Sequence, residues 1–210
     1  MKGKDPTDSG RMFKSPVVEA LTRAHISVPL TSFYGVSALV LWWSIARLHL
    51  PVISCVALFV VGAFFFTWVE YTVHRYFYHM RTDSPRRTRI QYMFHGVHHD
   101  HPRDKKRLAL PPIGTLVVAA LFIGLFRLVL GPYGFAFGGG FMAGYATYLA
   151  LHYAIHVYSP PHNFLKAVWK HHNLHHFVGD TAAFGVSSPL WDHVFGTMPE
   201  DPLAKRTAKG

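Results

Sequence analysis

The sequence predicts an all-α integral membrane protein with four transmembrane helices and a helical cap on the cytoplasmic side. Half of the 210 residues are hydrophobic, and they gather in four long runs. Basic residues concentrate in the polar segments between and beyond these runs, and the 16 histidines cluster in those segments and near the ends of the runs. The length suits one domain, so we expect residues 1–210 to form a single membrane-embedded unit.

The four apolar runs suit a hydrocarbon core, which takes roughly 20 helical residues to cross. They lie at about 26–48, 52–73, 113–130 and 135–155. Tight turns join the first run to the second at His49-Leu50-Pro51 and the third to the fourth at Gly131-Pro132-Tyr133-Gly134. Two re-entrant hairpins remain an alternative to four complete spans.

The polar segments are expected to lie in the cytoplasm. Residues 1–24 form a predicted solvated tail with a short interfacial helix near Val17–Ala24. Residues 80–111 form a central loop, and residues 158–210 form a final segment with helical character around Phe164–His176. Five basic residues precede the first run, eight lie in the central loop and five follow the fourth run. Because Lys and Arg are enriched in cytoplasmic loops, both termini and the central loop are placed on that side.

Composition narrows the possible partners. The formal net charge of +10 is compatible with nucleic acid or with an anionic membrane surface, and the apolar runs favour the membrane. We therefore expect no nucleic-acid partner. Cys55 is the only cysteine, which excludes an intramolecular disulfide and a cysteine-based zinc finger or iron–sulfur site.

Ten histidines form four spaced groups near the predicted cytoplasmic face. In the two H-x2-H-H groups, positions i, i+3 and i+4 share one face of a helix. Packing so many imidazoles together without a metal would leave polar nitrogens unpaired or positive charges crowded. Two metal ions with four or five nitrogens each fit the count. The predicted ligands are His74, His79, His95, His98, His99, His152, His156, His172, His175 and His176.

Six histidines are left outside the predicted ligand set. His171 could pair with His175 at i, i+4, but the H-x2-H-H register favours His172. The others are interpreted as interfacial or hydrogen-bonded residues: His25, His49, His101, His162 and His193. Iron is the expected metal for oxygen chemistry, whereas zinc has no redox role and could still occupy the sites in isolated protein.

The ordered motifs H-x4-H, H-x2-H-H, H-x3-H and H-x2-H-H, with four apolar runs, resemble the membrane fatty acid hydroxylase/sterol desaturase superfamily. The likeness covers residues 68–199. Three segments look most similar to the catalytic domain of fatty acid 2-hydroxylases. They are W-V-E-Y-T-V-H-R-Y-F-Y-H, H-G-V-H-H-D-H-P-R-D-K-K-R-L-A-L-P-P and F-G-V-S-S-P-L-W-D-H-V-F-G-T-M-P. One departure is Tyr148-Leu149, where such relatives commonly carry Tyr-Asp.

The resemblance implies a dimetal centre held by the ten histidines in a helical cap. It also implies that O2 is the cosubstrate and that one oxygen atom enters a C–H bond of a lipid acyl chain, with C2 as the expected position. Two electrons per turnover must then come from a separate donor of the cytochrome b5 or ferredoxin type.

Two acids and a basic cluster are further candidates. Glu70 and Asp192 are expected to accept hydrogen bonds from ligand histidines and to orient them. The alternatives are an ion pair of Glu70 with a base such as Arg75, and a local turn at Asp192. The basic cluster consists of Arg103, Lys105, Lys106 and Arg107. It is expected either to contact a lipid headgroup or the electron donor, or only to set the membrane topology.

Two other functions remain open. A sterol or carotenoid oxidase or desaturase would use the same scaffold. A non-enzymatic metal-binding protein or a metal transporter is the rival from another class. A transporter is expected to hold its ligands near mid-membrane between broken helices, whereas these histidines lie at the ends of the predicted helices.

Overall fold

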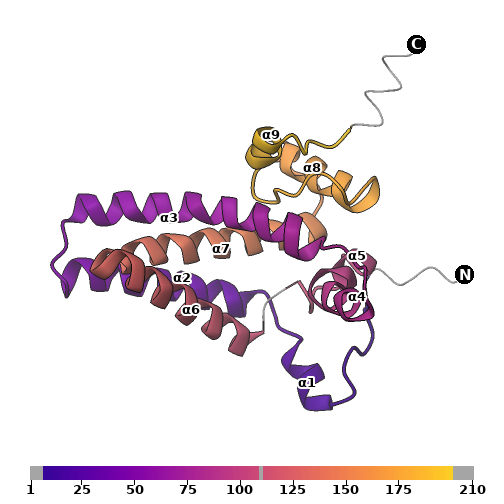
Figure 1. Cartoon of the computed structure of the whole chain (residues 1–210), viewed down its shortest axis with the longest axis horizontal. Helices are drawn as coiled ribbons and strands as arrows, with labels where there is room; N and C mark the ends of the chain where they lie inside the picture. The colour runs from indigo at the N-terminus through magenta and orange to yellow at the C-terminus, as the bar shows by residue number, and fades with distance from the viewer. Residues whose placement is uncertain (1–6, 109–110, 201–210) are drawn as a thin grey trace, which may run out of the picture.

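Four long helices lie side by side and form the body of the protein (Figure 1). The computed structural model describes residues 7–108 and 111–200, and every regular element within them is helical. The bundle consists of α2 (Ser27–Ala46), α3 (Val52–Val73), α6 (Pro112–Leu130) and α7 (Gly134–Val157). These helices coincide with the four predicted apolar runs to within a few residues, which confirms the all-α class.

The long helices are apolar enough for a membrane protein. By length and composition, three stretches could cross a membrane: Ser27–Ala46, Val52–Tyr78 and Ile113–Val157. The third stretch contains α6, a 3-10 turn (Gly131–Tyr133) and α7, and α6 folds back against α7. Large apolar side chains such as Leu121 and Leu128 point outward and are exposed, as expected for helices that face lipid.

Prolines and glycines delimit these helices. Pro51 precedes α3, and Pro112 opens α6, where the missing N–H costs no intrahelical hydrogen bond. Gly131 ends α6 with a φ of 59°, a conformation that glycine adopts without steric strain. The chain therefore reverses at the positions where the sequence has turn residues.

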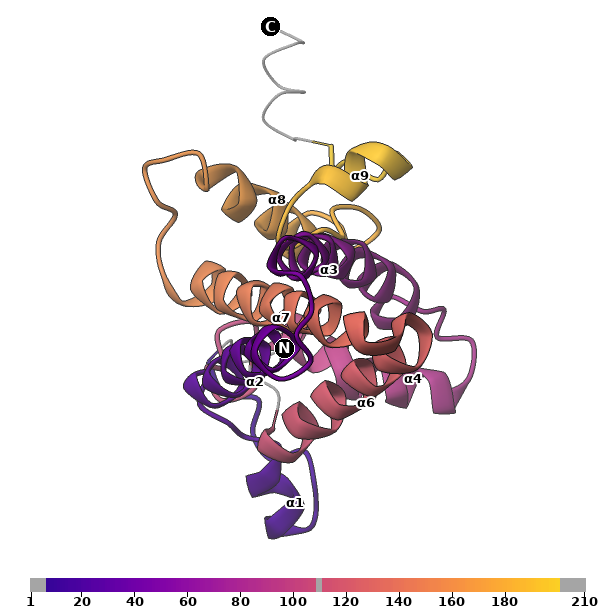
Figure 2. The same cartoon turned by 90° about the vertical axis from the view of Figure 1, so that its left-hand side faces the viewer.

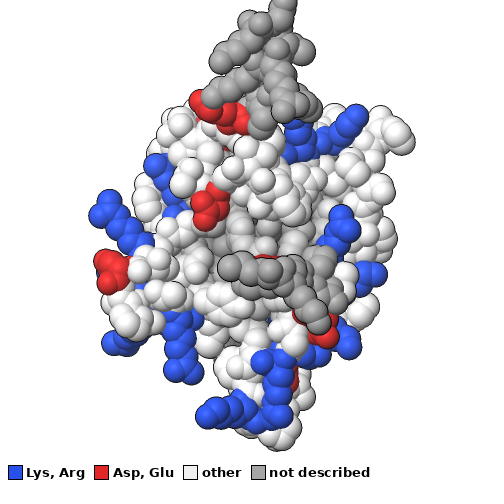
Figure 3. Space-filling model, turned by 90° about the vertical axis from the view of Figure 1, so that its right-hand side faces the viewer, with Lys and Arg blue, Asp and Glu red and all other residues white. Residues whose placement is uncertain are grey.

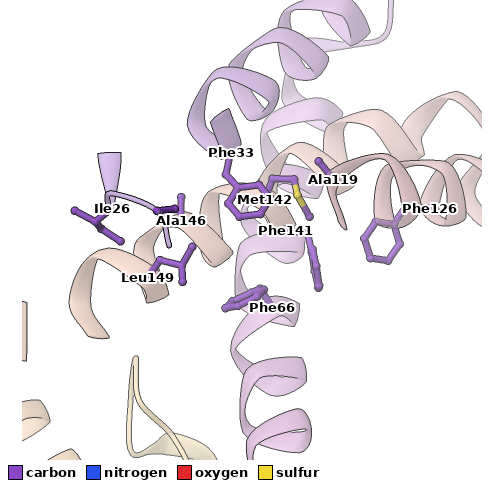
Figure 4. Packing of buried hydrophobic residues seen from close by; sticks show 10 residues of the cluster. Ile26, Phe33, Phe66, Ala119, Phe126, Phe141, Met142, Ala146 and Leu149 are labelled. Atoms are coloured by element: carbon purple, nitrogen blue, oxygen red, sulfur yellow. The ribbon is translucent and has the colours of Figure 1, made fainter. Parts of the chain in front are cut away.

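Helix α7 lies against α2, α3 and α6, as the end-on view shows (Figure 2). Its contact with α3 brings backbone against backbone. A Cβ atom at Gly140 would lie 1.8 Å from the carbonyl oxygen of Phe59, and one at Gly62 would lie 2.1 Å from that of Phe137. Small residues permit this close approach in membrane bundles. The core beside the contact contains Phe33, Phe66, Phe141 and Met142 (Figure 4).

Shorter helices gather at one end of the bundle and form a cap. They are α4 (Pro85–Gln91), α5 (Val97–Asp100), α8 (Lys166–Phe177) and α9 (Leu190–Phe195), with α1 (Pro16–Leu21) beside them. Helix α8 confirms the helical segment expected around 164–176, whereas α9 lies where the sequence indicated a loop. Lys and Arg outnumber Asp and Glu on this end of the molecule (Figure 3).

The described part of the N-terminal segment, residues 7–24, differs from the solvated tail that was predicted. Asp104 accepts hydrogen bonds from the backbone N–H and the hydroxyl of Ser9, at 3.0 and 2.7 Å. Arg107 forms an ion pair with Glu19, and the Arg107 side chain is only 7% exposed. Buried polar contacts therefore hold this segment against the loop after α5.

Candidate metal centre

The ten predicted ligand histidines come together at the cap end of the bundle as two groups of five. In each group, one ring nitrogen from every residue lies within 4.8 Å of the others. Site A consists of His74, His79, His95, His99 and His175. Site B consists of His98, His152, His156, His172 and His176. Within the described ranges, no other group of histidine, cysteine or acidic residues has this geometry.

A π-helical turn explains the H-x4-H spacing. In an α-helix, residues five apart point about 140° away from each other. Residues His74–Tyr78 continue α3 as a π-helix, in which the N–H of His79 donates to the carbonyl oxygen of His74 at 3.1 Å. The wider i→i+5 turn brings both imidazoles to site A. The H-x3-H pair, His152 and His156, lies on regular α-helix and enters site B together.

Each H-x2-H-H motif is divided between the two sites. His95 and His99 belong to site A while His98 belongs to site B, and the second motif has the reverse division. Residues at i and i+4 share a face, whereas neighbouring residues diverge by about 100°. The three imidazoles of a motif therefore project from one broad face of the helix but serve two adjacent sites.

The nitrogen spacing fits metal coordination. Two nitrogens at right angles, each about 2.1 Å from one ion, are about 3.0 Å apart. In site A, Nε2 of His95 lies 3.1 Å from Nε2 of His74 and 3.0 Å from that of His99. In site B, the Nε2 atoms of His156 and His172 are 2.9 Å apart. Both donor sets thus match five-nitrogen sites for a transition metal.

The pKa values of the ligand histidines outside the long helices are lowered, which favours the neutral imidazole. Burial, followed by the neighbouring imidazoles of His175 and His99, lowers the pKa of His79 to about 3. Burial and His175 lower the pKa of His99 to about 4. Burial also holds the pKa of His172 well below its usual range. Neutral imidazole is the form that binds metal, so no proton has to leave these rings at neutral pH.

Hydrogen bonds to backbone carbonyls define the tautomer of two ligands in site A. Nδ1 of His74 donates to the carbonyl oxygen of Phe184 at 2.6 Å, and Nδ1 of His175 donates to that of Ala182 at 2.7 Å. Because a carbonyl oxygen can only accept, the proton resides on Nδ1. The lone pair of Nε2 then faces site A.

Glu70 and Asp192 lie beside site A, but their hydrogen bonds go to the chain between α8 and α9. Glu70 accepts from the backbone N–H groups of Val186 and Ser187, at 2.6 and 2.9 Å. Asp192 accepts from His171 at 2.9 Å, so the carboxylate partner is the histidine left outside the ligand set. The predicted direct contacts with ligand histidines are therefore corrected to indirect ones.

The four residues of the basic cluster differ in exposure. Arg103, Lys105 and Lys106 are exposed and remain able to contact a headgroup or a donor. Arg107 is not, because its guanidinium binds Glu19 and also donates to the hydroxyl of Thr22 at 3.1 Å. Arg107 also lines a cavity beside His95 and His98, so its contact with a headgroup stays a prediction.

Two of the cavities that adjoin the sites lie against the helices of the bundle. The first, which we call the entry cavity, has a volume of about 350 Å³ and touches both sites through His95, His98 and His152. Met12 and Phe13 form part of its wall. Sequence reasoning missed these two residues, since no motif marks them. Leu149, at which the sequence departs from the Tyr-Asp pair expected from the resemblance, also lines this cavity.

The second cavity, which we call the apolar cavity, lies between α3, α6 and α7. Its volume is about 190 Å³, and its walls include Phe66, Phe122 and Phe141. Tyr145 and Tyr148 line both cavities. The two spaces therefore meet at shared walls, with His74 of site A on the apolar side.

The chain is similar to known proteins over most of its length. Residues 59–197 match the fatty acid hydroxylase family. Dihydroceramide fatty acyl 2-hydroxylase FAH1 of Arabidopsis thaliana is 34% identical over 186 residues, which are 80% of this chain and 78% of that protein. Fatty acid 2-hydroxylase of Mus musculus is 33% identical over 93% of this chain and 58% of its own length.

A solved structure gives the same result in three dimensions. Full-length scs7p, in which only the hydroxylase domain is visible, superposes with a TM-score of 0.82 at 29% identity, over 90% of this chain and 72% of that one. The fold, the four histidine motifs and the match over residues 59–197 agree: this chain belongs to the fatty acid hydroxylase family.

Proposed function

We propose that this protein is a membrane-bound dimetal monooxygenase that hydroxylates the acyl chain of a lipid at C2. The balanced reaction takes R–H, O2, two electrons and two protons to R–OH and water. One observation carries the proposal: a single cavity touches histidines of both five-nitrogen sites and shares wall residues with an apolar cavity within the bundle. The names of the relatives, which are fatty acyl 2-hydroxylases, support this choice of substrate and position.

The shape of the site suggests how an acyl chain is held. The apolar cavity, walled by Phe66, Phe122 and Phe141, accommodates the hydrocarbon tail away from the cap. The polar end then occupies the entry cavity, where Met12 and Phe13 exclude water from one side. The carbons near the carbonyl thereby lie next to His95 and His98, which fits oxidation close to that end.

The ten histidines would hold two iron ions, five nitrogens to each. Bound iron would supply the activation of O2, a role that zinc cannot fill. The protein contributes neutral imidazoles, two of them fixed by the carbonyl oxygens of Phe184 and Ala182. Tyr145 and Tyr148 provide walls that keep the reacting carbon apart from bulk water.

For topology we propose four spans with both termini and the cap in the cytoplasm. The four long helices run as a bundle with the cap at one end, and the basic residues favour that end as the cytoplasmic one. Lipid would then enter from the bilayer, and electrons would reach the sites from the cytosol.

A separate electron donor of the cytochrome b5 or ferredoxin type completes the proposal. Exposed Arg103 and Lys105 line a hollow next to His156 of site B. A second hollow, with Arg75 and Arg81 in its wall, lies next to His79 of site A. Either surface offers positive charge to an acidic redox protein within reach of a ligand histidine.

Lipid analysis tests the function directly. Lipids from cells that express the full chain with a competent reductant should contain acyl groups heavier by one oxygen, with fragmentation placing it at C2. Cells that express His98→Ala should lack them. An unchanged lipid profile with iron-loaded protein would refute the hydroxylase. Loss of two hydrogens from an acyl chain would indicate a desaturase. A product that forms only from added sterol would indicate a sterol oxidase.

A further inference from the structure

The segment between α8 and α9 joins the two buried acids to site A. We call residues 182–187 the strap. The strap supplies the carbonyl oxygens that accept from Nδ1 of two ligand histidines, Ala182 for His175 and Phe184 for His74. Any displacement of the strap would therefore change the orientation of both imidazoles.

Two carboxylates bind four consecutive N–H groups of the strap. Asp192 accepts from Phe184 at 2.9 Å and from Gly185 at 2.8 Å. Glu70 accepts from Val186 at 2.6 Å and from Ser187 at 2.9 Å, and it also binds the Ser187 hydroxyl. Asp192 is fully buried and Glu70 is 7% exposed, so water does not compete for these acceptors. Hydrogen bonds in such a low-dielectric interior are electrostatically stronger than those in water.

The backbone of the strap is adapted to these contacts. Ala183, between the two carbonyl groups, has a φ of 61°, in the left-handed region that alanine rarely occupies. A Cβ atom at Gly185 would lie 2.2 Å from the carbonyl oxygen of Ser188 and 2.9 Å from Oδ2 of Asp192. The strained Ala183 and the glycine at position 185 thus lie where the two acids hold the strap.

Within residues 7–108 and 111–200, no segment supports site B as the strap supports site A. Nδ1 of His172 and Nδ1 of His176 are buried, and neither has a hydrogen-bond partner among the described residues. A hydrogen bond from the second ring nitrogen orients a ligand imidazole and makes it a better donor to metal. Two of five ligands in site A have this support, while two of five in site B lack it.

We infer that Glu70 and Asp192 are positioning residues for site A alone, and that the strap makes site A the site that binds metal first and more tightly. The inference rests on the proposed two-metal centre. Its physical basis has two steps. The two acids fix the strap, and the strap fixes the tautomer and orientation of His74 and His175. Both Nε2 lone pairs therefore face the ion position before the ion binds.

Titration of the metal-free full chain in detergent with Zn²⁺ alone tests the inference, with calorimetry resolving the two binding steps. The wild type should show two unequal steps. Glu70→Ala and Asp192→Ala should weaken the tighter step by about 10- to 100-fold and leave the weaker step unchanged. Glu70→Gln keeps one oxygen acceptor for the strap and should restore most of the loss. His172→Ala should remove only the weaker step.

Asp104→Asn is the matched control, because Asp104 is also a buried carboxylate that accepts backbone N–H groups, from Ser9 and Lys106. Both binding steps should survive this substitution. Equal steps in the wild type, or equal weakening of both steps in the Glu70 variants, would overturn the inference. Asp192→Asn preserves side-chain volume but removes one of the two carboxylate oxygens that accept from the strap, so it replaces an alanine variant that fails to fold; loss confined to the tighter step remains the expected result.

The outcomes separate the inference from the proposed function. Two unequal steps without a hydroxylated lipid would leave the strap inference standing and refute the hydroxylase. Lipid hydroxylation by a protein whose tighter metal-binding step does not depend on Glu70 or Asp192 would support the hydroxylase and refute the strap inference.

Discussion

The contact between α3 and α7 makes Gly140→Ala the sharpest test of the bundle. The added Cβ atom would lie 1.8 Å from the carbonyl oxygen of Phe59, whereas non-bonded carbon contacts are about 3.5 Å or longer. The obstacle is backbone, so no side chain can rotate away. The helices must separate locally by about 1.5 Å, and overpacking of this kind costs about 1–3 kcal/mol.

Gly124→Ala is the matched control. Gly124 also lies within a long helix, but a Cβ atom there meets nothing within 4 Å. Alanine is favoured over glycine in a helix interior, so this variant should be stabilised by about 0.5–1 kcal/mol. The two alanine substitutions are chemically identical and are expected to have effects of opposite sign.

Thermal unfolding of the purified protein in detergent, followed by circular dichroism, measures both effects. For a chain of this size, 1 kcal/mol corresponds to a Tm shift of about 2–4 °C, so Gly140→Ala should unfold several degrees below the wild type and Gly124→Ala slightly above it. Gly62→Ala, on the facing helix, should add less to Gly140→Ala than it costs alone, because the helices are already separated. Equal Tm values for the Gly140 and Gly124 variants would refute the backbone contact.

Three further predictions follow from the site and the N-terminal segment. Burial raises the pKa of Glu19, but hydrogen bonds from Phe13 and Met12 and the charge of Arg107 outweigh it and lower the pKa to about 2. The Arg107–Glu19 ion pair should therefore persist at neutral pH and weaken as the pH falls from the ordinary glutamate pKa towards 2. Faster proteolysis of the N-terminal segment at low pH would report this weakening. Removing bound metal with a chelator should lower the Tm, since metal at 100 times its Kd adds about 2.7 kcal/mol per site, and re-addition of metal should restore it. Phe122→Ala should enlarge the apolar cavity and shift the product profile towards longer or bulkier acyl chains at unchanged metal content; an unchanged profile would remove this cavity from the acyl path.

The sequence predicted the bundle well because hydrophobicity and turn residues both act locally. Long apolar runs bounded by Pro51 and Gly131 leave few alternatives to helices of nearly the observed length. A similar reason applies to three of the four histidine motifs, because spacings of three and four residues bring imidazoles near one another on an α-helix. The H-x4-H pair comes together only on the π-helical turn.

The division into two sites was not predictable in the same way. It depends on the π-helical turn after Val73 and on the divergence of adjacent residues such as His98 and His99, which spacing alone does not report. The roles of Glu70 and Asp192 depend on where residues far along the chain come to lie. Met12 and Phe13 reach the entry cavity only because the Arg107–Glu19 pair anchors their segment.

The divided motifs also limit how the protein can move. His98 and His99 serve different sites, as do His175 and His176, so the two sites are joined twice by a single peptide unit with Cα atoms about 3.8 Å apart. A hinge between the sites would have to change the backbone dihedrals within α5 and within α8 at the same time and break helical hydrogen bonds in both. Breathing motions that admit a lipid must carry both sites as one rigid body and take place at the walls around them, where the N-terminal segment is held by a few polar contacts.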